Sequence, residues 1–162
     1  MNKNKNAPFV LPEGFQEATG FAAFATRNGP YYEKLVDEKT VIRAFRSDER
    51  HLNGVNYVHG GMLMSFADSA LARTVNHCTG KRAVTIKMNS EFLSPVREGD
   101  WIEAHCELVR DTRSIAFVRG TLKVGKRSVF KADALFHYIK PGSQETAKER
   151  ASKKKSQENE KK

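Results

Sequence analysis

The residues best suited to do chemistry lie in one stretch, His59 to Gly80, which reads HGGMLMSFADSALARTVNHCTG. Its apolar and small residues recur at helical spacing on two faces, and this pattern predicts one enclosed helix. Asp68 is the exception, because it falls among apolar residues, where a carboxylate needs a partner or a catalytic role. Gly60 and Gly61 begin the helix, and glycines there leave backbone N–H groups open to a ligand. Asp68 and these N–H groups are therefore the first candidates for a reactive site.

Distance separates the two candidates along the helix. An α-helix rises about 1.5 Å per residue, so Asp68 lies about 12 Å beyond Gly60. Attack on a carbonyl carbon creates an oxyanion, which needs hydrogen-bond donors about 3 Å away. One helix therefore cannot present both groups to the same carbonyl. Either the two groups are unrelated, or the site is composite, with Gly60 of one subunit facing Asp68 of another.

Length and charge limit the organisation of the chain. The 162 residues suffice for one domain with two loose ends, and the formal net charge is +9. Residues 141–162 hold seven basic and four acidic side chains and offer no apolar face, which predicts a basic disordered tail. Residues 1–19 are expected to form a partly disordered N-terminal extension. A nucleic-acid-binding arm is the less favoured interpretation, because the core lacks interleaved aromatic and basic residues.

The cysteines and the apolar runs indicate the compartment. Cys78 and Cys106 follow no CxxC spacing and lie in apolar patterns, which predicts small buried side chains in a reducing compartment, without a disulfide or a zinc site. The N-terminus has no apolar signal region, and no apolar run approaches the ~18 residues of a membrane span. We therefore expect a cytoplasmic protein that neither binds metal nor enters a membrane.

Apolar periodicity predicts the remaining elements. A short helix is expected within residues 12–26, ended by Asn28-Gly29-Pro30, and a hairpin over 31–36 and 40–45. Beyond Gly80 the pattern alternates, as is typical of half-buried strands. The expected strands are 83–93, 102–108, 116–124 and 130–138, and the links between them are 95–100, 111–113 and 125–126. Such short links favour antiparallel neighbours, so the sequence predicts an α+β domain whose sheet curls around the long helix.

The stretch from Asn53 to Asp68, NGVNYVHGGMLMSFAD, resembles the signature of the PaaI-type acyl-CoA thioesterases of the hotdog superfamily. The match continues through TIKMN at 85–89 and FLSP at 92–95, so it covers about residues 20–140. The resemblance implies a hotdog thioesterase domain over 20–140, in which a curved antiparallel sheet wraps one long central helix. It also implies an acyl-CoA substrate, no cofactor, and homodimers that join their sheets edge to edge and often pair into homotetramers.

The same resemblance implies roles for single residues. The N–H of the first glycine after the histidine, here Gly60, polarises the thioester carbonyl. The helix aspartate, here Asp68, acts as general base or nucleophile, and Thr85 helps to place the water. Asn53 and His59 correspond to residues that shape the thioester and leaving-group end.

Each role has a purely structural alternative. Gly60 could only permit close packing against the sheet, and Asp68 could pair with Arg73. His59 could hydrogen-bond to nearby backbone, and Asn53 could stabilise a turn. In a regular strand Thr85 shares a face with Lys87 and Asn89, so pointing it at Asp68 requires the right twist or a subunit boundary.

The substrate is defined only by class. Gly61 and Met64 are expected at the substrate site, and Lys81, Arg82 and Arg113 are candidate contacts for the CoA phosphates, although surface charges often serve only solubility. Aromatic and medium-chain acyl groups both fit this interpretation. Two alternatives stay open: a non-catalytic acyl-thioester-binding protein, and a hotdog enoyl-thioester hydratase.

Overall fold

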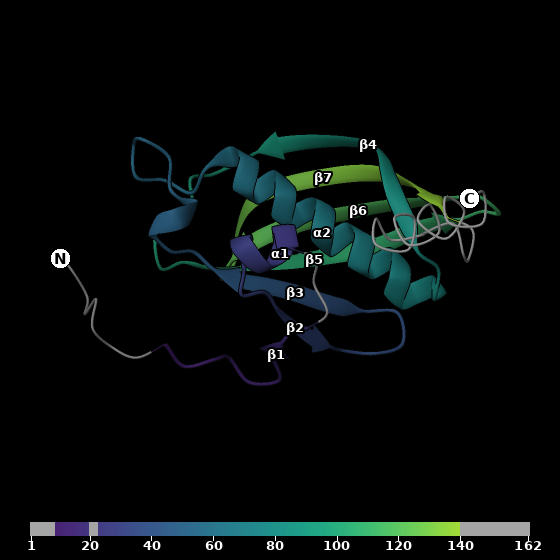
Figure 1. Cartoon of the computed structure of the whole chain (residues 1–162), viewed down its shortest axis with the longest axis horizontal. Coiled ribbons are helices and arrows are strands. Elements are labelled where there is room, and N and C mark those ends of the chain that lie inside the picture. The colour runs from purple at the N-terminus through teal and green to yellow at the C-terminus, as the bar shows by residue number, and fades with distance from the viewer. Residues whose placement is uncertain (1–8, 20–22, 140–162) are drawn as a thin grey trace, which may run out of the picture.

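A computed structural model describes residues 9–19 and 23–139 as one long helix packed against one antiparallel sheet (Figure 1). The sheet has the order β1-β2-β3-β5-β6-β7-β4. Its strands are β1 Gln16–Glu17, β2 Tyr32–Leu35, β3 Val41–Arg46, β4 Ala83–Phe92, β5 Trp101–Asp111, β6 Ile115–Val124 and β7 Arg127–Tyr138; the helices are α1 Ala23–Asn28, the 3-10 turn η1 Glu49–His51 and the long α2 Gly60–Thr79. This confirms the predicted α+β architecture of a curved sheet around a central helix.

Both ends of α2 are fixed by local signals in the sequence. The His59 side chain accepts a hydrogen bond from the Gly61 N–H at the start, and Gly80 ends the helix at φ 67°, a left-handed conformation that glycine adopts without strain. One face is buried against the sheet: Met62, Leu63, Phe66, Ala67, Ala70, Leu71, Thr74 and Val75. The prediction of a fully enclosed helix is wrong for a single chain, because Met64 remains 38 % exposed.

The core strands follow the predicted alternation. The predicted hairpin is β2–β3, and β5, β6 and β7 are antiparallel neighbours. Their alternate side chains Ile102, Ala104, Val118, Leu122, Phe130 and Phe136 are buried beneath α2. The sheet therefore positions α2 through a continuous apolar layer.

The expected pairing of β4 with the next strand in sequence is wrong. β4 pairs with β7 at the edge of the sheet, while β5 pairs with β3. The link between β4 and β5 crosses the end of the sheet near the start of α2, where Val96 is buried and its carbonyl accepts from the Val58 N–H. Because this buried crossing anchors the link, its short length does not force the two strands to pair.

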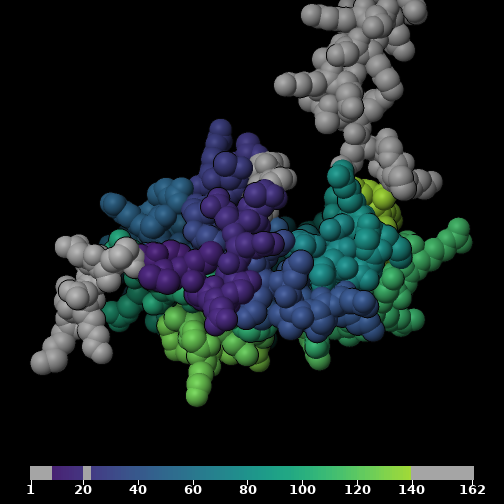
Figure 2. Space-filling model, turned by 90° about the horizontal axis from the view of Figure 1, so that it is seen from below, coloured from purple at the N-terminus to yellow at the C-terminus, as the bar shows by residue number. Residues whose placement is uncertain are grey.

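The N-terminal prediction also needs correction. Among the described residues of this region, 12–19 are not helical, whereas Ala23–Asn28 forms a helix, which ends before Gly29 as predicted. Gly14 adopts φ 81°, which is incompatible with a right-handed helix, and β1 pairs with β2. Phe9 and Phe15 pack on Trp101, with ring centroids 5.4 and 5.2 Å apart, and the purple N-terminal residues lie against the blue β2–β3 region in Figure 2.

Several expectations concern residues beyond these ranges. The predicted basic tail at 141–162 lies outside the described residues, as do 1–8 and 20–22.

Cys78 and Cys106 are free and partly exposed, rather than fully buried. Burial raises the pKa of the Cys106 thiol to about 12, which keeps it protonated. No helix in the described ranges combines the length and apolarity that crossing a bilayer requires.

Candidate active site

Asp68 lies in the middle of α2 and opens into a cavity of about 350 Å³. The Thr85 hydroxyl of β4 donates a hydrogen bond to Asp68 Oδ1 at 2.5 Å. The rest of the lining is mostly apolar: Phe24, Ala25, Tyr31, Met64, Ser65, Ser69 and Met88. A carboxylate that accepts one hydrogen bond and faces an apolar cavity has a second oxygen available for chemistry.

A β-bulge explains how Thr85 reaches Asp68. The pairing of β4 with β7 shifts between Thr85 and Lys87, so Ile86 is an extra residue in β4. The bulge reverses the alternation of the strand, and Thr85 and Met88 both face α2. The Thr85–Asp68 contact therefore forms within one chain, without the subunit boundary that a regular strand would need.

Gly60 forms a second, separate part of the candidate site. A Cβ at this position would lie 3.0 Å from Cε1 of Phe92, so glycine permits close packing of the Phe92 ring over the start of α2. Phe92 packs edge-to-face on Phe130 at 5.0 Å and is still 56 % exposed. Within the described residues the Gly60 N–H has no hydrogen-bond acceptor. Gly60 thus allows close packing and also presents a free donor; its role towards a carbonyl stays a prediction.

His59 and Gly61 complete the start of the helix. His59 Nδ1 accepts from the Gly61 N–H at 2.9 Å, which places the proton of the neutral ring on Nε2. The His59 N–H donates to the His51 carbonyl at 2.7 Å, so the backbone before the helix is also fixed. The Gly61 N–H is therefore occupied, and Gly60 alone offers a free N–H of this pair.

Asn53 organises the loop before α2. Its Oδ1 accepts from the N–H groups of Val55 and Tyr57 at 3.0 and 3.1 Å, and its own N–H donates to the Tyr57 carbonyl at 2.7 Å. Asn56 adopts φ 61° in this loop, which asparagine tolerates better than most residues. The side chain of Asn53 is thus engaged in the turn interaction that was its structural alternative.

The basic candidates lie at the opposite end of α2. Lys81 and Arg82 follow the helix, and Lys81 Nζ contacts Asp111 Oδ2 at 3.3 Å beside the turn that contains Arg113. Twenty residues of helix span about 30 Å, so these side chains lie far from Gly60 of the same chain. The structure brings Asp68, Thr85 and Met64 together, brings Gly60, Gly61 and His59 together with Asn53 nearby, and leaves these three basic residues apart.

Sequence reasoning missed two residues that support the site. Phe92 belongs to the FLSP stretch at 92–95, and nothing in the sequence indicates that its ring packs on Gly60. Arg43 is buried on β3 and donates hydrogen bonds to Ser69, the neighbour of Asp68. Its signal was present in the sequence, because an arginine stands between Val41 and Phe45 at positions that alternate toward the core.

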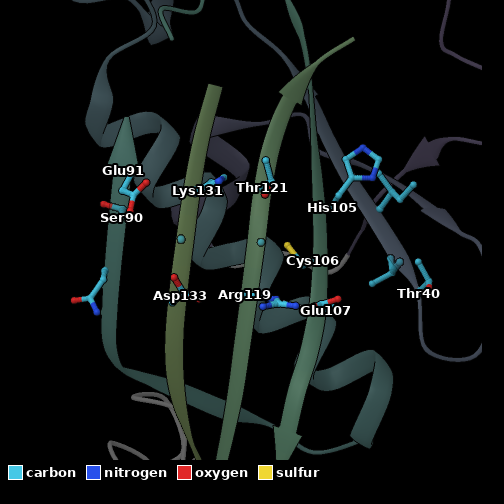
Figure 3. A pocket seen from close by; sticks show the side chains of 15 residues that line it. Thr40, Ser90, Glu91, His105, Cys106, Glu107, Arg119, Thr121, Lys131 and Asp133 are labelled. Atoms are coloured by element: carbon cyan, nitrogen blue, oxygen red, sulfur yellow. Dashed lines mark hydrogen bonds and ion pairs between the residues drawn. The ribbon is translucent and has the colours of Figure 1, made fainter. Parts of the chain in front are cut away.

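A larger cavity of about 740 Å³ lies on the outer face of the sheet, away from the candidate residues (Figure 3). Three of its ionisable side chains form ion pairs: Glu107 with Arg119, and His105 with Glu103 at 3.1 Å. Such a balanced, exposed set of charged side chains is typical of the solvated face of an antiparallel sheet.

The described ranges also contain no cluster of three His, Cys, Asp or Glu side chains arranged to hold a metal.

Comparisons with known proteins place this geometry in a family. The family model described as thioesterase superfamily matches residues 55–131. The Pseudomonas aeruginosa protein named "Putative esterase PA0474" is 30% identical over 129 residues, which are 78% of this chain and 96% of that protein. The chain belongs to the thioesterase superfamily. The stretch matched by the family model contains both Gly60 and Asp68.

Further similarities of this thioesterase-superfamily member agree with the predicted hotdog fold and PaaI-type resemblance. The mouse protein "Acyl-coenzyme A thioesterase 13" is 24% identical over 98 residues, which are 54% of this chain and 69% of that protein. The solved structure of the Escherichia coli PaaI protein from the phenylacetic acid degradation operon aligns with a TM-score of 0.68 at 24% identity, over 74% of this chain and 86% of that one. The predicted hotdog fold is confirmed, and the arrangement of the chain is similar to that of this PaaI protein.

Proposed function

We propose that the protein hydrolyses the thioester of an acyl-CoA to the free acid and CoA. One observation carries the proposal: the Asp68 carboxylate, held by Thr85 at 2.5 Å, opens into a mostly apolar cavity that could take an acyl group. Membership of the thioesterase superfamily supports the reaction type. Similarity to the mouse acyl-coenzyme A thioesterase supports the leaving group.

Asp68 supplies the reactive oxygen in either of two routes. As a general base, it accepts a proton from water while the water oxygen bonds to the thioester carbon. As a nucleophile, it bonds to that carbon itself, and water later cleaves the mixed anhydride. In both routes the carbonyl becomes an oxyanion, its collapse breaks the C–S bond, and the CoA thiolate then takes up a proton. Thr85 occupies Oδ1 and leaves the other oxygen directed to the reaction.

The oxyanion donor in this proposal is the Gly60 N–H of a second subunit. Within one chain the helical rise separates Gly60 from Asp68 by about 12 Å, whereas the donor must lie about 3 Å from the oxyanion. In this proposal the second subunit of a homodimer joins along β4, which is an edge strand of the sheet within the described residues and carries exposed apolar side chains, among them Val84, Ile86 and Phe92. Pairing of two such dimers into a homotetramer remains part of the proposal.

The acyl group is aromatic or of medium length. A cavity of about 150 Å³ holds one benzene ring, so the Asp68 cavity of about 350 Å³ suits a ring with a short linker, or a medium chain. His59 and Asn53 shape the leaving-group end by fixing the loop and the start of α2. Contacts of Gly61 with substrate, and of Lys81, Arg82 and Arg113 with CoA phosphates, stay predictions.

The experiment is a thiol-release assay on a panel of acyl-CoAs, with the acid product identified by mass spectrometry. Thioester hydrolysis releases stoichiometric CoA and free acid. A protein that binds acyl-CoA without releasing thiol would contradict the proposal and favour the non-catalytic alternative. Hydration of an enoyl-CoA without thiol release would favour the hydratase. Asp68→Ala, purified in parallel, excludes a contaminating thioesterase.

A further inference from the structure

Arg43 is an unusual residue for its position. It lies on the inward face of β3 between Val41 and Phe45 and is only 8 % exposed. Burial lowers its pKa to about 10, so the guanidinium is still charged at neutral pH. Replacing buried ion pairs by apolar residues is often neutral or stabilising, so stability alone does not explain an arginine here.

The guanidinium connects the sheet to α2 beside Asp68. Arg43 Nη1 donates to Ser69 Oγ at 2.7 Å and to the Ser69 carbonyl at 3.2 Å. Ser69 follows Asp68 in α2 and lines both the Asp68 cavity and a second cavity that contains Arg43. The contact therefore holds the helix at the residue next to the reactive carboxylate.

The neighbouring strand β2 contacts the other side of the Arg43 guanidinium. Glu33 of β2 lies 4.0 Å from Arg43 Nη2 and accepts two hydrogen bonds from Arg73, at 2.9 and 3.3 Å. Two strands thus fix the guanidinium that contacts Ser69. Arg73 shares Glu33 with Arg43, and both of these Arg73 hydrogen bonds go to Glu33.

We propose that Arg43 is a positioning residue for Asp68, acting through Ser69; this rests on the proposed function of Asp68. Side-chain ends lie about 5 Å from a helix axis, so a rotation of α2 by about 10° displaces the Asp68 carboxylate by about 1 Å. A displacement of that size breaks the hydrogen bond from Thr85, which should cost about 10-fold in rate, and misplacement of a reacting group can cost up to about 100-fold. Arg43 fixes this rotation, and so keeps Asp68 Oδ1 within hydrogen-bond distance of Thr85.

Three variants test the contact, with one matched control. Ser69→Ala removes the Oγ acceptor, Arg43→Met removes the guanidinium but keeps its length, and the double variant removes both. Arg73→Met is the control, because it removes an arginine from the same cavity without removing the Arg43–Ser69 contact. Each protein is assayed for kcat and KM with the best acyl-CoA, and its crystal structure is determined.

The expected kinetic result is a fall in kcat of about 10-fold for Arg43→Met and less for Ser69→Ala, with KM within about 2-fold. The double variant should be no worse than Arg43→Met, because both changes remove one interaction. Arg43→Lys should recover part of the loss, and Arg73→Met should stay within about 2-fold of wild type. Equal losses in Arg73→Met and Arg43→Met, or an unchanged kcat in both Arg43→Met and Ser69→Ala, overturn the inference.

The crystal structures separate this inference from the proposed function. In Arg43→Met the Asp68 Oδ1 to Thr85 Oγ1 distance should exceed about 3.5 Å, the limit of a hydrogen bond. An unchanged distance overturns the inference, whatever the activity. If wild type releases no thiol from any acyl-CoA, the proposed function fails, and this distance alone decides the role of Arg43. If Arg43→Met does not fold, Ser69→Ala carries both readouts.

Discussion

The surroundings of Asp68 and of Gly60, the two candidate parts of the site on α2, differ in how many of their partners one chain supplies. Around Asp68 the chain supplies its own partner, Thr85, and a cavity of about 350 Å³. At the start of the helix the Gly60 N–H finds no acceptor among the described residues, and the Phe92 ring beside it is 56 % exposed. The first place is organised within one chain, whereas the second is open to solvent. This difference favours a site in which Asp68 of one subunit acts together with the Gly60 N–H of another.

The two edges of the sheet show a parallel contrast. The β2 edge is covered by β1 and by the N-terminal aromatic packing on Trp101. The β4 edge is ten residues long and exposes Val84 and Ile86 by 48 % and 53 %. Proteins normally protect long apolar edges, and a second copy would do so here. The protected edge lies away from the open start of α2, and the unprotected edge carries Phe92.

The largest expected effect tests the Asp68 place. Asp68→Asn keeps the size of the side chain and an acceptor for Thr85, but it removes the charge, so kcat should fall by at least about 100-fold. Steady-state kinetics and a melting curve measured together check this expectation. A variant that melts like wild type and retains its kcat would show that Asp68 is only structural.

Thr85 should have the next largest effect. Thr85→Val removes the donor to Asp68 but keeps the branched shape, and a lost hydrogen bond to a charged group predicts a fall in kcat of about 10-fold. Thr85→Ser is the matched control, because it keeps the hydroxyl and should stay within about 3-fold. Equal activity of the Val and Ser variants would remove Thr85 from the site.

A smaller effect is expected at Gly60, at the start of α2. Gly60→Ala keeps the N–H but puts a Cβ at 3.0 Å from Phe92 Cε1, and the exposed ring can rotate away. The melting temperature should change by less than about 3 °C, while kcat/KM should fall about 5-fold because the methyl group obstructs the approach to the N–H. Combining Gly60→Ala with Phe92→Ala removes the packing conflict. Recovery of full activity in that double variant would mean that glycine serves only packing.

The smallest effect concerns Glu33, which contacts Arg43 and Arg73 near Asp68, and the dependence of stability on pH. Burial raises the pKa of the Glu33 carboxyl, but the hydrogen bond and charge of Arg73 and the charge of Arg43 outweigh it, so the pKa lies below its ordinary value of 4.5. Its stabilising contribution is therefore complete above that value and is lost as the pH falls through the lowered pKa. Between about pH 5 and pH 3 wild type should lose a few °C more in Tm than Glu33→Gln does. Parallel slopes would show that this ion pair contributes nothing.

The sequence predicted what depends on local pattern. The bounds of α2 follow from His59 and Gly80, and the candidate reactive residue Asp68 stood out because it interrupts an apolar face. Thr85 was harder to place, because a bulge at Ile86 reverses the alternation, whereas the apolar residues Val84, Ile86 and Met88 keep an unbroken period of two across the bulge.

The remaining misses are long-range. The position of β4 beside β7 depends on the buried crossing at Val96, and a short link alone suggested the wrong neighbour. The proposed role of Arg43 depends on its contact with Ser69, which lies 26 positions away in the chain. Such contacts join elements that no local periodicity relates, so only the folded chain reveals them.

The most direct test of the shared site mixes two inactive proteins. Gly60→Pro removes the N–H and adds a ring whose Cβ would lie 3.0 Å from Phe92 Cε1, a contact that the exposed Phe92 ring can relieve by rotating. The helix should still form, since proline is tolerated at the first helical position and His59, at φ −59° and ψ 135°, already has the backbone that precedes a proline. Loss of one oxyanion donor should cost about 100- to 1,000-fold in kcat. Asp68→Ala provides the other inactive protein.

Equal amounts of the two variants are unfolded, refolded together, and checked for mixed dimers by mass spectrometry. Random assortment makes half of the dimers mixed, and each mixed dimer has one site with an intact Gly60 and an intact Asp68. The shared site therefore predicts recovery of about a quarter of wild-type activity. If the mixed dimers form, Gly60→Pro melts as a folded protein, and activity stays at the level of the separate variants, then Gly60 and Asp68 of different subunits do not act on one thioester.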